Sequence, residues 1–229
     1  MNFIKKIFKT NSILYYYWFN MFRKAESNSL RLPESGDDLY FDGYPRSGNT
    51  YSYWLLVYFY PNLKITHHLH TIGALKIAIQ KKIKCLIIIR NPLDCVSSFY
   101  FTKTYEDNNG DISHEILKNL LVDYIEYYQF VAINNLKVLK FDDLLFNQKF
   151  VIQNFSEILS SDSIEESKID SEIKKFEMTF KKKEKHKKLT YSSLPKPERE
   201  NFKNKIKKEL NKYDLMDKAL SIYFKLSDN

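Results

Sequence analysis

The stretch LYFDGYPRSGNTYSYWLLVYFY, residues 39–60, predicts a strand, a turn and a helix in direct succession. Leu39–Phe41 is apolar, like the end of a short buried strand, and Tyr51–Phe59 is strongly apolar, like a buried helix. Between them, Gly43–Thr50 is polar and contains two glycines and a proline. A strand, a glycine-containing turn and a helix in this order direct backbone N–H groups and a helix N-terminus at an anion. We therefore expect an anion-binding turn here.

The turn GYPRSGNT, Gly43–Thr50, is close to the nucleotide-triphosphate loop G-x-x-x-x-G-K-[ST]. Asn49 stands where that loop has its lysine, and an asparagine cannot neutralise the charge of a β- or γ-phosphate. Pro45 also removes one backbone donor from the cradle. A nucleotide kinase or NTPase with a degenerate loop is therefore the alternative interpretation and not the first one.

The segment YPRSGNTY, Tyr44–Tyr51, matches a different phosphate loop more closely. It resembles the 5′-phosphosulfate loop of the PAPS-dependent sulfotransferases, usually written Y-P-K-S-G-T-T-W. PAPS is 3′-phosphoadenosine 5′-phosphosulfate, the donor of the sulfuryl group in that family. Five of the eight positions are identical, and the departures are Arg46 for lysine, Asn49 for threonine and Tyr51 for tryptophan. Arginine keeps the positive charge of the lysine but cannot easily lose its proton.

A second segment, IIIRNPLDCVSSFY, Ile87–Tyr100, resembles the motif that binds the 3′-phosphate in the same family. That motif is a buried strand ending in arginine, followed by N-x-x-D-x-x-x-S-x-Y. The matching residues here are Arg90, Asn91, Asp94, Ser98 and Tyr100. The two motifs, in this order and at this separation, are together much more specific than either alone. By this resemblance the chain is similar to the cytosolic and bacterial PAPS-dependent sulfotransferases.

The physical chemistry of the second segment supports the same interpretation without the family. Ile83–Ile89 is a continuous apolar run of strand length, which is typical of a parallel strand buried on both faces. Arg90 follows this run, at the carboxyl end of a strand, where open α/β sheets bind ligands. Its planar guanidinium can hold a phosphate through two hydrogen bonds. A nucleotide hydrolase would instead need an aspartate at this place to hold its magnesium ion.

Strands that alternate with helices predict an α/β fold of three layers, in which a central parallel sheet is flanked by helices. The resemblance implies the sulfotransferase fold, which is like that of the P-loop NTPases. We expect a single domain over residues 1–229, with the clear resemblance confined to residues 39–159. Residues 160–188 are highly charged and are expected to form a mobile surface segment or lid, and residues 195–226 a C-terminal helix.

Apolar patterns predict the remaining elements. We expect a short strand in Leu63–His70, a loop over Glu106–Asp111, a long helix over Ile112–Asn134, a strand over Leu136–Phe141 and helical structure over Asp142–Leu159. At the N-terminus, Ile13–Phe22 is apolar but too short to span a bilayer. We interpret it as a first helix that either packs on the domain or makes peripheral contact with a membrane surface.

The resemblance implies which residues bind the donor PAPS and its product PAP, 3′-phosphoadenosine 5′-phosphate. The 5′-phosphosulfate would contact Arg46, Ser47, Gly48, Asn49, Thr50 and Tyr51, and the 3′-phosphate would contact Arg90 and Ser98, with Phe141 near the adenine. No metal is required, because these side chains supply the positive charge. The family's late segment R-K-G-x-x-G-x-W is not recognisable. Ser192–Lys203 is its only candidate, with Arg199 and Lys203 as anion contacts, and a solvated helix start is the favoured interpretation there.

Sulfuryl transfer needs an acceptor that gives up its proton, and the family uses a histidine between the two motifs for this. The segment ITHHLHT contains His67, His68 and His70. His68 lies at the family's distance from the motif arginine, so we choose it as the general base. His70 is the second choice, because His68 and His70 share a face of an extended segment while His67 points away. Three histidines could also bind zinc, or serve structure alone, but H-H-x-H lacks a carboxylate partner and we expect no metal site.

The composition limits the classes of partner. The net charge of +8 suggests an anionic partner, and two cysteines without a disulfide framework favour a reducing, cytoplasmic location. A nucleic-acid or anion-binding module using the Lys-rich segment 174–188 is the third class of function, and includes a non-catalytic relative of the sulfotransferases. The segment lacks an aromatic platform for bases, so we expect no nucleic acid.

The resemblance implies an acceptor with a hydroxyl or amine group, and a small molecule, a lipid or a carbohydrate would all qualify. Acceptor pockets in this family are built by variable loops, which we expect at Glu106–His114 and Ser160–Lys188. The sequence leaves both the acceptor and the oligomeric state open.

Overall fold

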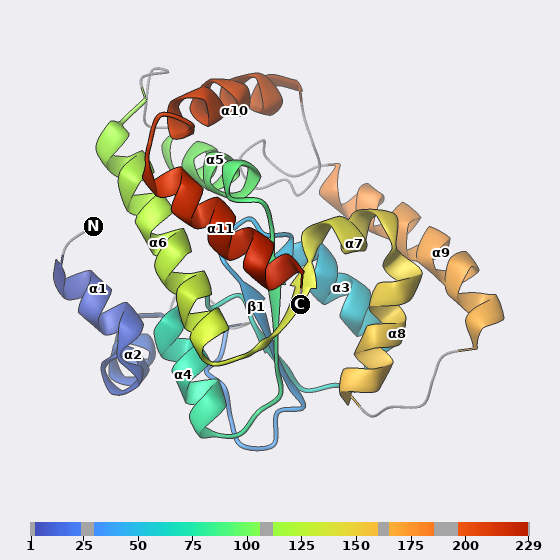
Figure 1. The fold of residues 1–229 in the computed structure, drawn as a ribbon. Helices are drawn as coiled ribbons and strands as arrows, with labels where there is room; N and C mark the ends of the chain where they lie inside the picture. The colour runs from blue at the N-terminus through green and yellow to red at the C-terminus, as the bar shows by residue number, and fades with distance from the viewer. Residues whose placement is uncertain (1–2, 24–29, 106–111, 160–164, 186–196, 229) are drawn as a thin grey trace.

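In the computed structural model of the chain, the residues described are 3–23, 30–105, 112–159, 165–185 and 197–228. Over these ranges, four parallel strands form one sheet in the order β2-β1-β3-β4. The strands are β1 (Leu39–Gly43), β2 (Ile65–His67), β3 (Cys85–Ile89) and β4 (Lys137–Lys140). Helices cover both faces of the sheet (Figure 1). The predicted α/β fold, with a parallel sheet as the middle of three layers, is confirmed.

Alternating side chains of the strands supply two separate cores. Tyr40, Ile87 and Ile89 point into the core on one face, whereas Phe41 and Ile88 point into the core on the other. These five side chains are at most 1% exposed. Burial on both faces explains why β3 reads as an unbroken apolar run and not as an alternating one.

The first face of the sheet is covered by helices from both halves of the chain. They are α4 (Ile72–Gln80), α5 (Pro92–Thr104), α6 (His114–Ile133) and α11 (Leu215–Ser227), with α10 (Pro197–Leu210) packed on α5. Helix α5 begins as predicted, because the Asn91 side chain accepts a hydrogen bond from the Leu93 N–H and Pro92 takes the first helical position.

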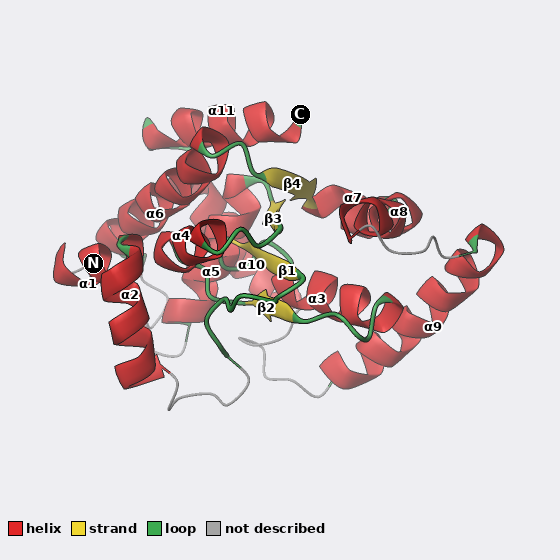
Figure 2. Ribbon diagram, turned by 90° about the horizontal axis from the view of Figure 1, so that it is seen from below, coloured by secondary structure: helices red, strands yellow, loops and turns green. Residues whose placement is uncertain are grey.

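The second face is covered by α3 (Asn49–Phe59), α7 (Phe141–Phe146), α8 (Gln148–Leu159) and α9 (Glu166–Glu184). Figure 2 shows the sheet between this group and the helices of the first face. Two predictions for this region are wrong in detail. Phe141 does not end strand β4 but begins α7, and the predicted helical stretch Asp142–Leu159 is divided at Asn147. The division arises because Asn147 leaves the helical backbone conformation, with φ −140° and ψ 46°.

The predicted C-terminal helix over residues 195–226 is also wrong, because two helices occupy this region. A turn at residues 211–214 separates α10 from α11, with hydrogen bonds from the Tyr213 N–H to the Leu210 carbonyl and from the Met216 N–H to the Tyr213 carbonyl. The turn lets α10 pack on α5 while α11 packs on α6.

The charged region 160–188 contains a regular element that its composition hides. Residues 166–184 form α9, and its apolar face buries Ile169, Ile173, Phe176 and Phe180 at helical spacing. Residues 160–164 and 186–188 lie outside the described residues, and movement of this region as a lid stays a prediction. The expected loop Glu106–Asp111 also lies outside them.

The N-terminal residues form short helices, α1 (Phe3–Thr10), α2 (Ser12–Trp18) and the π-helical turn η1 (Phe19–Arg23). Tyr15 and Phe19 are buried in the first core, and α2 packs on α4, as expected for a first helix that packs on the domain. None of the helices described is long and apolar enough to cross a bilayer. Contact with a membrane surface stays a prediction.

Candidate active site: a cationic cavity at the carboxyl ends of the strands

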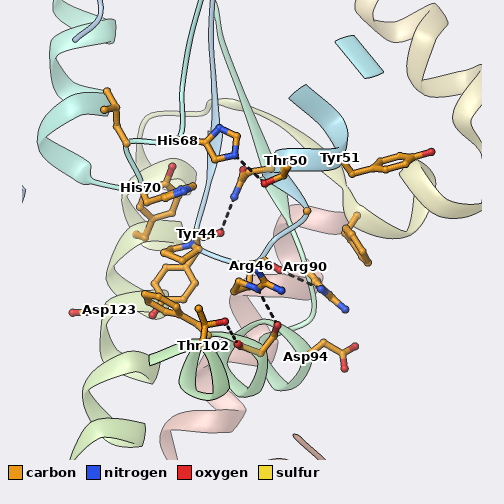
Figure 3. A pocket seen from close by; sticks show the side chains of 18 of the residues that line it. Tyr44, Arg46, Thr50, Tyr51, His68, His70, Arg90, Asp94, Thr102 and Asp123 are labelled. Carbon is orange, nitrogen blue, oxygen red and sulfur yellow. Dashed lines mark hydrogen bonds between the residues drawn. The ribbon is translucent and has the colours of Figure 1, made fainter. Parts of the chain in front are cut away.

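A cavity of about 1370 Å³ opens at the carboxyl ends of the strands (Figure 3). Each strand delivers residues to its wall: Tyr44–Arg46 and Gly48 follow β1, His68–His70 follow β2, Arg90 follows β3 and Phe141 follows β4. Carboxyl ends of parallel strands are where open α/β sheets bind ligands. The sheet therefore brings the two sequence motifs to one site.

The two glycines of the first turn are required by close contacts. A Cβ atom at Gly43 would lie 2.5 Å from the carbonyl oxygen of Ile88, and one at Gly48 would overlap the ring of Phe141. Gly48 also has φ +98°, which other residues rarely adopt. The turn thus lies directly against β3 and against the start of α7.

Two polar residues hold the turn from inside. The Asn49 amide donates to the Tyr44 carbonyl at 3.1 Å, which gives it a structural function within the turn. The Ser47 hydroxyl lies 3.0 Å from the Tyr128 hydroxyl and 3.2 Å from Cys95 Sγ, and it is fully buried. Of the nucleotide-binding residues that the resemblance implies, Ser47 is the one that does not line the cavity.

Helix α3 begins at the cavity wall. Gly48, Asn49 and Thr50 line the cavity, and the N-cap residue Gly48 makes no side-chain capping hydrogen bond. The first N–H groups of a helix have no partner within the helix. With the partial positive charge of the helix end, these groups are suited to bind an anion.

Arg46 connects the two sequence motifs. Its Nε donates a hydrogen bond to the Ser98 hydroxyl on α5 at 3.1 Å (Figure 3). Burial, followed by the charges of Arg199 and Arg90, lowers the pKa of Arg46 to about 10. Since an arginine with this pKa still carries its charge at neutral pH, the cavity holds several cations close together.

Arg90 lies beside the first turn and is held there by three contacts. Its Nη1 donates to the Arg46 carbonyl at 3.1 Å, its guanidinium carbon lies 4.1 Å from the centre of the Phe141 ring, and its own carbonyl accepts from the Tyr124 hydroxyl at 2.8 Å. Its buried Nε has no hydrogen-bond partner among the described residues. Arg90 thus lies beside the first turn, and its Nε can still donate a hydrogen bond to a ligand.

Two cations of α10 complete the cluster, and the favoured interpretation of their segment as a solvated helix start is wrong. Arg199 and Lys203 line the cavity with side chains that are each only 5% exposed. Burial lowers the pKa of both, and Arg90 lowers them further, whereas the nearby Glu200 acts in the opposite direction. No family motif marks these residues, and their signal in the sequence is only their spacing of one helical turn.

The described structure gives His70 a buried carboxylate partner that the sequence analysis missed. His70 Nδ1 lies 2.7 Å from Asp42 Oδ1 and 2.7 Å from the Gly43 carbonyl oxygen. Asp42 is fully buried, and its Oδ2 also accepts hydrogen bonds from the Tyr40 hydroxyl and from the N–H groups of Leu69 and His70. Burial opposes ionisation of Asp42, but the His70 contacts outweigh it and lower its pKa to about 2.

His68 also lines the cavity, and its Nε2 lies 3.2 Å from the Thr50 hydroxyl. The extended conformation expected for this segment is wrong, because His68 and His70 have φ values of 59° and 52°. The Asp42 carboxylate imposes this bent path by accepting the N–H groups of Leu69 and His70. Both side chains nevertheless line the same cavity, with ring centres 5.5 Å apart.

His67 contacts His68 through their Nδ1 atoms, but its ring is directed away from the cavity. Its ring stacks on Tyr53 with a centroid distance of 3.6 Å, and burial lowers its pKa to about 4. It is absent from the cavity wall. Within the described ranges, no group of three histidine, cysteine or acidic side chains could hold a metal ion.

Tyr51 lies at the far wall of the cavity. Its hydroxyl accepts a hydrogen bond from the Gln148 amide, and its ring meets Phe176 and Phe180 of α9 edge-on at 5.4 and 5.1 Å. Helix α9 therefore closes the cavity on the side of the Tyr51 ring.

The fold and this site define a class: an α/β domain with a parallel sheet, whose first turn and neighbouring cations line one cavity. Among solved structures, the chain is similar to the crystal structure of mouse sulfotransferase SULT7A1 complexed with PAP, with a TM-score of 0.51 and 14% sequence identity. The similarity covers 84% of this chain and 91% of the mouse protein. The chain therefore has the sulfotransferase fold. No protein-family model and no curated protein sequence matches it.

Proposed function

We propose that the protein is a PAPS-dependent sulfotransferase, which moves a sulfuryl group from PAPS to a hydroxyl or amine group of an acceptor. The observation that carries the proposal is the cluster of Arg46, Arg90, Arg199 and Lys203 beside the uncapped start of α3. Glu200 pairs with Arg199 and Lys203, but the cluster still concentrates positive charge at low exposure, which favours the binding of an anion. Binding of PAP by the mouse protein of the same fold also supports it.

In this proposal the two ends of PAPS use two parts of the cluster. The 5′-phosphosulfate contacts the first turn, the N–H groups of α3 and the Arg46 guanidinium. The 3′-phosphate contacts Arg90, Ser98 and the two cations of α10, and the adenine lies near Phe141. Arg90 donates to the Arg46 carbonyl, so both parts are close enough for one nucleotide to span them.

The proposed reaction is a direct displacement at sulfur. The acceptor oxygen forms a bond to sulfur as the bond from sulfur to the phosphate oxygen breaks, and PAP leaves with the electron pair of that bond. Arg46 and the α3 N–H groups stabilise the charge that grows on the leaving oxygen. Since the side chains supply the positive charge, the proposal requires no metal ion.

We propose His70, in place of the first choice His68, as the base that takes the proton from the acceptor. Both atoms near His70 Nδ1 are hydrogen-bond acceptors, namely Asp42 Oδ1 and the Gly43 carbonyl oxygen. Nδ1 must then carry the proton in the neutral ring, which leaves the lone pair on Nε2. The buried Asp42 carboxylate would stabilise the imidazolium that forms on proton uptake. His68 would orient the Thr50 hydroxyl.

The experiment that tests this function is a thermal-shift comparison of PAP with ATP, each with and without magnesium. We expect PAP to raise the melting temperature without magnesium, and to raise it more than ATP does. A magnesium-dependent shift with ATP, and none with PAP, would instead support the kinase or NTPase alternative. Steeply salt-dependent binding of DNA, without a shift by PAP, would support the nucleic-acid-binding alternative.

A further inference from the structure

We propose that the half of the cavity opposite the cation cluster binds the acceptor, and that the acceptor is a neutral polyhydroxylated ring, such as a sugar. This inference rests on the proposed function. The acceptor chamber, as we call this half, is lined by Phe8, Trp18, Phe99, Asp123, Glu126 and Tyr127.

The acceptor chamber lies on the histidine side of the reacting centre. Figure 3 shows Asp123, Tyr44 and His70 on one side of Arg46, with Arg90 and Asp94 on the other. Tyr44 comes directly after strand β1 in the sequence. The centre of its ring lies 5.7 Å from the centre of the Phe99 ring and 6.5 Å from the centre of the Tyr127 ring. An acceptor in the chamber would thus face both the base and the sulfuryl group.

The charges in the acceptor chamber are of both signs, with the two carboxylates of Asp123 and Glu126 set among Lys6, Lys9 and Lys103. Lys6 forms an ion pair with Glu126, which joins α1 to α6. Asp123 is half-buried, with Lys9 and Lys103 near it. A carboxylate in such a setting still accepts hydrogen bonds from hydroxyl groups, and a lysine ammonium still has donors for their oxygens. The chamber therefore favours a ligand with many hydroxyl groups and no net charge.

Tyr127 gives the chamber a polar group that lacks a partner. The side chain is 3% exposed, and its hydroxyl has no hydrogen bond within the described part of the chain. Such a group is costly unless a ligand or a water molecule completes it. Burial raises the pKa of this phenol well above its ordinary value, and the Asp42 charge raises it further.

The walls of the acceptor chamber complete the argument for a ring-shaped polyol. Phe8, Trp18 and Phe99 offer aromatic surface to the C–H faces of a sugar ring. A purely apolar alcohol would remove Asp123 from water without replacing its hydrogen bonds. A polyanionic acceptor would meet the carboxylates of Asp123 and Glu126.

The test uses the full chain saturated with PAP and a panel of methyl glycosides, with 2-naphthol as the apolar alcohol. Saturation-transfer NMR measures which probes bind. We expect at least one methyl glycoside to bind more tightly than 2-naphthol. We expect Asp123→Asn and Tyr127→Phe each to weaken binding of that glycoside about tenfold, because the first removes the charge of a hydrogen-bond acceptor and the second removes a hydroxyl group. The affinity for PAP should not change.

Two controls separate binding from folding. Asp217→Asn makes the same chemical change at an exposed position of α11 and should leave glycoside affinity unchanged. Tyr127→Phe removes a hydroxyl that has no described partner, so it should not lower the melting temperature. Tighter binding of 2-naphthol, no binding of any glycoside, or unchanged affinity in both variants would overturn the inference. If PAP itself fails to bind, the proposed function fails first, and the acceptor chamber with it.

Discussion

At the scale of single residues, the choice between His68 and His70 as the base gives a direct prediction. We expect His70→Gln to lower kcat by about 10²–10⁴-fold, the usual contribution of a general base. His68→Gln should cost less, because His68 Nε2 lies against the Thr50 hydroxyl, whereas His70 Nδ1 lies against the Asp42 carboxylate. Sulfate transfer from PAPS, measured once an acceptor is found, gives both rates.

The binding of PAP serves as the control for these two variants. Both should bind PAP as the unchanged protein does, since neither histidine belongs to the cation cluster. A larger loss for His68→Gln than for His70→Gln would return the role of base to His68, the residue that the family spacing indicates.

The buried Asp42 predicts how stability depends on pH. Its pKa in the folded protein is about 2, below the ordinary value of 3.8, so the unfolded chain binds the proton first as the pH falls. The stability that its charge provides is present above pH 4 and is lost as the pH falls toward 2. The difference of nearly two between the Asp42 pKa values of the folded and unfolded chain corresponds to about 2 kcal/mol in the free energy of unfolding.

Urea denaturation from pH 6 to pH 2.5 measures the free energy of unfolding of the unchanged protein and of His70→Gln. This variant lacks the main partner of the Asp42 charge. We expect the stability of the variant to begin its decline at a higher pH than that of the unchanged protein. Burial lowers the pKa of His67 to about 4, which adds a decline in stability below pH 6.5 to both proteins, so the two proteins are compared below pH 4, where Asp42 titrates. If the stability of the two proteins fell in parallel with pH, the claim that His70 stabilises the Asp42 charge would be contradicted.

Single residues also mark the limit of what the sequence could predict. Arg46, Arg90 and Ser98 were found because they belong to motifs with fixed spacing. Asp42 was missed because an aspartate beside a glycine at the end of a strand has no special pattern. Its meaning appears only when the chain after β2 bends around it.

At the scale of elements, helix α10 carries a prediction about nucleotide binding. We expect Arg199→Ala and Lys203→Ala each to raise the Kd of PAP about tenfold, because each removes a charge-assisted hydrogen bond to a phosphate. Lys208→Ala is the matched control, since Lys208 is an exposed lysine on the same helix. Isothermal titration calorimetry measures the Kd of PAP for all three variants. If all three variants bind PAP equally well, α10 has no part in the site.

Helix α9 carries a prediction about stability. Phe176 is 4% exposed and packs on Tyr51, whereas Met178 on the same helix is 64% exposed. We expect Phe176→Ala to lower the free energy of unfolding by about 3–5 kcal/mol and Met178→Ala by about 0.5 kcal/mol or less. Urea denaturation gives both values. Equal values would show that α9 contributes little to the fold.

The elements were predicted unevenly, and the reason is physical. Strands β1 and β3 and helices α3 and α5 carry apolar runs and a helix cap that local sequence determines. The turn between α10 and α11 contains no proline or glycine, so the inward positions of the two helices read as one continuous pattern. The many lysines of α9 hid an apolar face of four residues.

At the scale of the whole molecule, the sheet order brings the site together. Strand β1 lies between β2 and β3, so the histidine segment and Arg90 flank the first turn. The alternation of strands and helices predicts a parallel sheet, but it does not fix the order of the strands or bring α10 beside α5. Long-range packing decides both. The net charge of +8 likewise indicates an anionic partner without locating the four cations.

The central claim is that one nucleotide with a phosphate at each end is held by the two parts of the cation cluster. Isothermal titration of the protein with PAP and with adenosine 5′-monophosphate, both without magnesium, measures the contribution of the second phosphate. We predict that PAP binds at least about tenfold more tightly, since the 3′-phosphate gains charge-assisted hydrogen bonds from Arg90 and α10. Equal affinities for the two nucleotides would contradict the account.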